Sequence, residues 1–103
     1  MVKLDYRIGY VLGTGDAGDA VATLLRTFLY DPGTRLMSVE RLHNLARRNG
    51  VNPSLYLHLN IGHQRMIISN RLRAIVRKGG SVVIGNAIVT PEGTITPMNS
   101  FMG

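Results

Sequence analysis

The chain is short, basic and free of cysteine: it has 103 residues, 12 Lys and Arg against 6 Asp and Glu, and a formal net charge of +6. This length predicts one domain with a single core. The absence of cysteine excludes disulfides, cysteine nucleophiles and thiolate zinc sites. The apolar runs are too short to span a membrane, and the first ten residues lack the apolar segment of a signal peptide. We therefore expect an intracellular, cytoplasmic protein.

The basic residues are concentrated in one block. Residues 41–78 contain no Asp or Glu, whereas five of the six acids lie in the first forty residues. Such a block is typical of a protein that binds a polyanion, although a merely solvated basic face would also account for it. The basic residues of the block are Arg41, Arg47, Arg48, Arg65, Arg71, Arg73, Arg77 and Lys78.

Residues 1–12 alternate apolar and polar side chains, which predicts a half-buried strand. Its expected partner is the C-terminal region, the other part of the chain with a β pattern. The glycines of GTGDAG, residues 13–18, follow this strand with the spacing of a dinucleotide-binding loop. Asp16 and Asp19 argue against that function, because they put negative charge where a pyrophosphate would lie on the helix N-terminus. Asp16 is instead predicted to cap a helix.

That helix is predicted over residues 17–30. Val21, Leu24, Leu25 and Phe28 recur at helical spacing and would face the core. The sequence Asp-Pro-Gly at 31–33 ends the helix, and residues 34–37 are long enough for one short strand.

Two helices joined by a tight turn are predicted over residues 38–60. Ser38 is a good N-cap for the first, and Val39, Leu42, Leu45 and Ala46 supply its apolar face. Gly50 can close this helix in the left-handed conformation, while Asn52 and Pro53 are suited to begin a second helix. The connection is then about three residues long, as in a helix-turn-helix.

The residues LARRNGVNPSLYLHL, 45–59, resemble the helix-turn-helix superfamily of DNA-binding proteins, and most closely its winged-helix branch. Ala46 is small where the second helix would cross, and Val51, Tyr56 and Leu59 are placed to share a core. The resemblance implies a sequence-specific DNA-binding protein, a transcriptional regulator that binds duplex DNA as a homodimer. The N-terminal strand and helix, or the C-terminal tail, would form the dimer interface.

A further helix is predicted over residues 64–78. Ile68, Leu72, Ile75 and Val76 form its apolar stripe, with Asn70, Arg73 and Arg77 on the opposite face.

The chain then changes to a β pattern. Residues 82–84 and 87–90 are separated by Gly85 and Asn86, a two-residue hairpin connection, and a second turn at 90–93 precedes residues 94–96. These turns carry no Lys or Arg, so we expect the sheet to support the core more than to contact the phosphates of DNA.

Either of two predicted helices could contact the bases of DNA. The helix at Pro53 would present Asn52, Ser54 and His58, but Leu57 and Ile61 fall on the same face. Those two either contact thymine methyl groups or are buried, under the next helix or against a second subunit. The helix at Gln64 would present residues suited to base edges and phosphates. The candidate DNA-binding residues are Arg41, Arg47, Arg48, Asn52, Ser54, His58, Arg65, Asn70, Arg73, Arg77 and Lys78.

Catalysis has little support in the sequence. Metal-dependent nucleases need clustered carboxylates, and the basic block has none. His43, His58 and His63 could bind a metal only if the fold gathered them. No nucleophile motif surrounds a serine. We therefore expect no enzyme activity, no cofactor and no metal.

The predicted fold class is α+β: a helix-turn-helix (winged-helix-like) core of three to four helices (17–78), an N-terminal strand (1–12) and a small C-terminal antiparallel sheet (81–97). The alternative function is a non-enzymatic protein interaction module whose basic face docks on an acidic protein. Leu57 and Ile61 favour that alternative, and the acid-free block favours DNA. RNA fits less well, because the chain lacks an aromatic platform for stacking bases.

Overall fold

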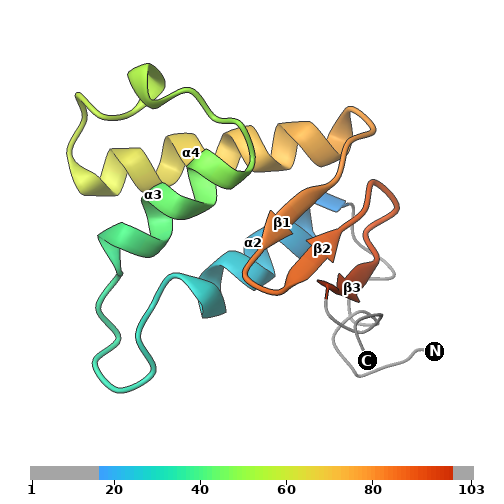
Figure 1. Ribbon diagram of the computed structural model, residues 1–103, viewed down its shortest axis with the longest axis horizontal. Coiled ribbons are helices and arrows are strands. Elements are labelled where there is room, and N and C mark those ends of the chain that lie inside the picture. Colours follow the sequence, from blue (N-terminus) through green and yellow to red (C-terminus); the bar gives the residue numbers. More distant parts are fainter. Residues whose placement is uncertain (1–16, 99–103) are drawn as a thin grey trace.

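Three α-helices and a three-stranded antiparallel sheet make up residues 17–98, the part of the chain that the computed structural model describes (Figure 1). This arrangement agrees with the predicted α+β class. The strand predicted over 1–12, its pairing with the C-terminus, the Asp16 cap and the tail at 99–103 lie outside the described residues. The elements are α2 (Ala17–Phe28), α3 (Val39–Arg48), the 3-10 helix η2 (Pro53–Leu55), α4 (Ile61–Arg77), β1 (Val82–Ile84), β2 (Ala87–Val89) and β3 (Ile95–Pro97).

The core forms where α2, α4 and the sheet meet. Of the predicted stripe of α4, Ile68 and Leu72 are completely buried and Val76 is nearly so, while Ile75 is only half-buried at the edge of the core. From α2, Val21 and Leu25 pack into the same cluster. Each such side chain contributes roughly 1.5–3 kcal/mol by leaving water, so this stripe fixes α4 against α2. Within residues 17–98 no helix has both the length and the apolar character needed to cross a bilayer.

α2 ends at Phe28, two residues before the predicted end. The strand predicted at 34–37 is wrong, because only a single bridge joins Tyr30 to Met37. Arg35 has a φ of 62°, a left-handed conformation that interrupts an extended strand. The chain between the bridge residues is instead a turn, in which the Arg35 amide donates to the Asp31 carbonyl at 2.8 Å.

α3 forms where it was predicted. The Ser38 hydroxyl accepts a hydrogen bond from the Arg41 amide at 3.3 Å, which confirms the N-cap. Leu42, Leu45 and Ala46 are buried as expected, but Val39 is 46% exposed and does not join the core. Gly50 has a φ of 75°, as the predicted left-handed closure requires.

The second helix predicted from Pro53 is not an α-helix. The Asn52 side chain does cap the segment, accepting from the Ser54 amide at 3.0 Å, but the helix stops after the three residues of η2. α3 and α4 are therefore joined by residues 49–60, far more than the tight turn of a helix-turn-helix. Val51 and Tyr56 are buried in the core as predicted, and Leu59 is half-buried.

α4 begins at Ile61, three residues before the predicted start at Gln64. Contacts at this end of α4 explain why the segment from Pro53 does not continue as a helix. The Asn60 side chain caps α4 by accepting from the His63 amide at 2.9 Å. The buried Gln64 side chain donates to the Leu59 carbonyl at 2.7 Å, and its oxygen lies 2.7 Å from His43 Nε2 on α3. Gln64 thus ties the end of the connecting segment to both helices.

The C-terminal sheet confirms the predicted meander, with strand order β1-β2-β3. β1 and β2 pair from Val82–Val89 to Ile84–Ala87, and Gly85 in the turn has a φ of 61°, which the first central position of a type II′ turn requires. Val82, Ile84 and Val89 are buried. The sheet therefore supports the core, as expected from turns that carry no Lys or Arg.

One side chain joins α3 to the sheet. Asn49, the C-cap of α3, donates to the carbonyls of Leu45 and Val83, each at 2.9 Å, and accepts from the Val83 amide at 2.8 Å. Its amide therefore pairs with the backbone of β1 as a neighbouring strand would. This contact sets the position of the β1–β2 hairpin beside the C-terminal end of α3.

We predict that Asn49→Ala lowers the free energy of unfolding by about 2–3 kcal/mol, because it leaves partly buried polar groups of Val83 unpaired. Asn70→Ala is the matched control: Asn70 is exposed on α4, and its replacement should change stability by less than about 0.7 kcal/mol. Urea unfolding followed by circular dichroism measures both. Equal effects of the two substitutions would show that the Asn49 contact does not stabilise the fold.

Candidate nucleic-acid interface

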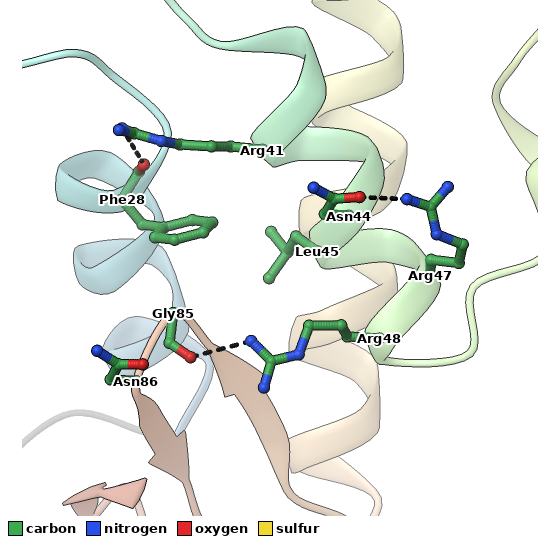
Figure 2. Close-up of a pocket in the computed structure, with 8 residues that line it drawn as sticks. All are labelled: Phe28, Arg41, Asn44, Leu45, Arg47, Arg48, Gly85 and Asn86. Atoms are coloured by element: carbon green, nitrogen blue, oxygen red, sulfur yellow. Dashed lines mark hydrogen bonds between the residues drawn. The ribbon is translucent and has the colours of Figure 1, made fainter. Parts of the chain in front are cut away.

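An open pocket of about 410 Å³ lies between the end of α2, the exposed side of α3 and the β1–β2 turn (Figure 2). We call it the α3/hairpin pocket. Phe28 and Leu45 give it an apolar floor, and polar side chains surround that floor. Its lining residues are Phe28, Arg41, Asn44, Leu45, Arg47, Arg48, Gly85 and Asn86.

Arg41 is held at one side of this pocket. Its guanidinium donates to the Phe28 carbonyl at 3.3 Å, lies 3.4 Å from a carboxylate oxygen of Asp31 and sits 6.0 Å from the centre of the Phe28 ring. Asp31 therefore offsets much of the Arg41 charge, although a half-exposed pair of this kind is worth at most about 1 kcal/mol.

Arg48 is held at the opposite side. It donates to the Gly85 carbonyl at 3.1 Å and lies 3.7 Å from the Met98 sulfur. Arg47 hydrogen bonds to the side-chain oxygen of Asn44, and in Figure 2 its guanidinium lies on the far side of Asn44 from Phe28. Both arginines are exposed. Their side chains are thus partly ordered before any ligand arrives, which lowers the entropic cost of binding.

A second pocket, of about 250 Å³, lies between the end of α3, the connecting segment and α4. We call it the α3/α4 pocket. Arg71 and Lys78, seven residues apart on α4, bring two exposed cations to it, and Asn52 lines it from the connecting segment. Both pockets reach the C-terminal end of α3, where Arg48 lines the first and the next residue, Asn49, lines the second.

We define the α3–α4 basic surface as Arg47, Arg48, Arg71 and Lys78. Among the described residues, no acidic residue lines either of these two pockets. The C-terminal end of α3 contributes a dipole equivalent to about half a negative charge, which the two arginines in its last turn outweigh. The surface is therefore strongly positive, and it combines parts of the chain more than twenty residues apart.

The remaining basic candidates lie elsewhere. Arg65 and Arg73 line a third pocket, between α2 and α4, together with Arg26 of α2. Arg77 lies against α2, so close that a Cβ on Gly18 would be 2.6 Å from its guanidinium. Asn70 and Arg77 are exposed, whereas Arg73 is half-buried beside α2. These three residues therefore do not form the single exposed face opposite the core that their spacing predicts.

The residues predicted for the reading helix at Pro53 do not form a common face. Ser54 lies in η2, and His58 is exposed in the turn that follows it. Neither lines any of the three pockets. Leu57 is 55% exposed, so α4 does not bury it, and Ile61, the first residue of α4, is 37% exposed. Contact with thymine methyl groups or with a second subunit stays a prediction for these two.

Sequence reasoning missed several polar residues that the fold brings to the pockets, among them Arg26, Asn44, Arg71 and Asn86. Arg71 had a usable signal, because seven residues are about two helical turns and put Arg71 and Lys78 on one side of α4. No sequence pattern pointed to Asn86, since its place beside α3 depends on how the β1–β2 hairpin packs against that helix.

Within residues 17–98, no three His, Cys, Asp or Glu side chains gather in a way that could hold a metal ion. His43 instead pairs with Gln64 and lies 5.5 Å from the Tyr56 ring. Comparison with protein-family models, with curated proteins and with solved structures finds no match for this chain. Function must therefore be inferred from the side chains themselves.

The contacts of the two adjacent arginines predict different effects on stability. Arg48→Gln should lower the free energy of unfolding by about 1 kcal/mol, because it removes the bond to the Gly85 carbonyl. Arg47→Gln should change it by less than about 0.5 kcal/mol, since Arg47 is exposed and bonds only within α3. Thermal unfolding of both variants tests this. A larger loss for Arg47→Gln would mean that Arg47 has a structural role.

Proposed function

We propose that this protein binds duplex DNA through the α3–α4 basic surface. One observation carries the proposal: cations from α3 and from α4 line two open pockets that both reach the C-terminal end of α3, and no carboxylate of the described residues lines either pocket. A surface with one sign of charge attracts the phosphates of DNA and releases their counterions. Arg47 and Arg48 are suited to phosphate contacts, because the guanidinium can form two parallel bonds to phosphate oxygens.

The proposal assigns α3, and not the segment at Pro53, to the duplex. α3 is exposed along Asn44, Arg47 and Arg48, and an α-helix with its side chains is about 10–12 Å in diameter, which the major groove of about 12 Å width accepts. Glu40 lies in the first turn of α3 and would be repelled by phosphate. The C-terminal half of α3 is therefore the part that approaches DNA.

Sequence-specific reading and a role in transcription form the finer part of the proposal. Asparagine amides can bond adenine at two positions, and Asn44 and Asn86 both line the α3/hairpin pocket. The order of three helices followed by a hairpin supports a winged-helix-like arrangement, and the long connection between α3 and α4 departs from it. A homodimer would supply the second set of contacts that a single small module needs.

The first test measures the salt dependence of DNA affinity. If the four cations each neutralise one phosphate, the logarithm of affinity should fall against the logarithm of salt concentration with a slope of about −3.6. The double variant Arg47→Gln/Arg71→Gln should reduce that slope to about −1.8, because two phosphate contacts are lost. Fluorescence anisotropy of a labelled duplex measures both slopes.

Arg35→Gln is the control for each single substitution, because it removes one positive charge from an exposed residue that lines none of the three pockets. Its slope should equal that of the parent protein. A slope reduced by about 0.9 in Arg35→Gln, half the change expected for the double variant, would mean that net charge alone drives binding. Absence of binding at low salt would reject DNA and favour an acidic protein as the partner of the basic surface.

The second test addresses base reading. Selection from a pool of random duplexes should enrich one sequence motif for the parent protein, and Asn86→Ala should weaken the preference at one position by roughly 1–3 kcal/mol while leaving the salt slope unchanged. Failure of the parent protein to enrich any motif would reduce the proposal to non-specific DNA binding.

A further inference from the structure

A third pocket, of about 230 Å³, lies between α2 and α4 and has no part in the proposed DNA surface. We call it the α2/α4 pocket. Three arginines line it, together with two residues that bear hydroxyl groups, while Ala22 and Leu25 provide apolar lining. The charged and polar lining residues are Arg26, Tyr30, Arg65, Ser69 and Arg73.

The arginines come from two facing helices. Arg65, Ser69 and Arg73 follow one another at intervals of four residues and so form a row along α4. Arg26 reaches the pocket from α2. Within residues 17–98 none of the three arginines forms an ion pair with a carboxylate. Three like charges around one pocket repel each other unless an anion lies between them.

Arg73 adds an independent observation. Its Nε atom is buried and has no hydrogen-bond partner among the described residues. A buried N–H group without a partner is unfavourable, and nearly all such groups in folded proteins are satisfied. An anion in the pocket would offset the three charges, and a small rotation of the Arg73 side chain would bring its Nε–H group to an acceptor there.

We propose that the α2/α4 pocket binds a phosphate group. Phosphate offers several acceptor oxygens, which match the donors of guanidinium groups and hydroxyls. The pocket is several times larger than the roughly 30 Å³ that one water molecule occupies in the liquid, so it has room for such a group. The phosphate is carried either by a small molecule or by a nucleic-acid backbone, and the chemistry of recognition is the same for both.

The site is separate from the α3–α4 basic surface. Arg71 and Arg73 are two positions apart on α4 and therefore point about 200° apart around its axis. Arg71 lines the α3/α4 pocket and Arg73 the α2/α4 pocket. α4 thus presents basic residues on two opposite sides. Phosphate binding between α2 and α4 is therefore independent of whether the α3–α4 basic surface binds DNA.

The test follows the Arg73 Nε–H resonance by NMR while inorganic phosphate replaces chloride at constant ionic strength. We expect a saturable shift of that resonance. Arg65→Gln should weaken phosphate affinity by about tenfold, because it removes one charge-assisted interaction. Arg35→Gln, which removes an equal charge away from the pocket, should leave the affinity unchanged.

Arg73→Lys adds a check on geometry, since it keeps the charge but loses the Nε donor and the planar fork. It should also weaken binding, as followed by the 31P resonance of phosphate. The proposal is overturned if the Arg73 resonance shows no saturable shift, or if Arg35→Gln weakens binding as much as Arg65→Gln does.

DNA-binding measurements on the same variants distinguish the two carriers of phosphate, a small molecule and the nucleic-acid backbone. If the backbone of DNA enters the pocket, Arg65→Gln should reduce the salt slope by about 0.9. If a small molecule supplies the phosphate, the slope should not change although phosphate binding is weakened. A protein that binds phosphate but no DNA would reject the DNA proposal alone, so the two proposals fail separately.

Discussion

The position of the C-terminal sheet relative to α3 depends on the hydrogen bonds of one side chain, that of Asn49. It closes α3 through the Leu45 carbonyl and at the same time bonds both backbone groups of Val83 in β1. This double role brings the hairpin turn to the end of α3, where the Gly85 carbonyl accepts from Arg48. These contacts hold the hairpin turn beside α3, and the α3/hairpin pocket lies between those two elements and the end of α2 (Figure 2).

α4 organises the other side of the molecule. Its apolar stripe packs into the core, so its polar residues are divided into two sets on either side of that stripe. Arg71 and Lys78 turn toward α3, whereas Arg65 and Arg73 turn toward α2. One continuous basic block in the sequence thus becomes two separate basic sites, for which duplex DNA and a phosphate group are the proposed ligands.

Local patterns predicted most of the helices and the hairpin. The Ser38 cap, the Ile68, Leu72 and Val76 stripe and the Gly85–Asn86 turn each depend on a few neighbouring residues, so sequence reasoning was sufficient for them. The same reasoning failed at Pro53. A capping residue followed by proline permits a helix, but the contacts of Gln64 with Leu59 and His43 decide where the chain turns.

The sequence by itself determined the α+β class, the apolar faces of the helices and the concentration of charge between residues 41 and 78, because these follow from periodicity and composition. Only the tertiary structure decided which charges lie together. The placement of Arg48 beside Gly85, and of Arg26 beside Arg65 and Arg73, arises from contacts between segments far apart in the chain. No periodicity encodes such contacts, since they depend on how the core orients each helix and the hairpin.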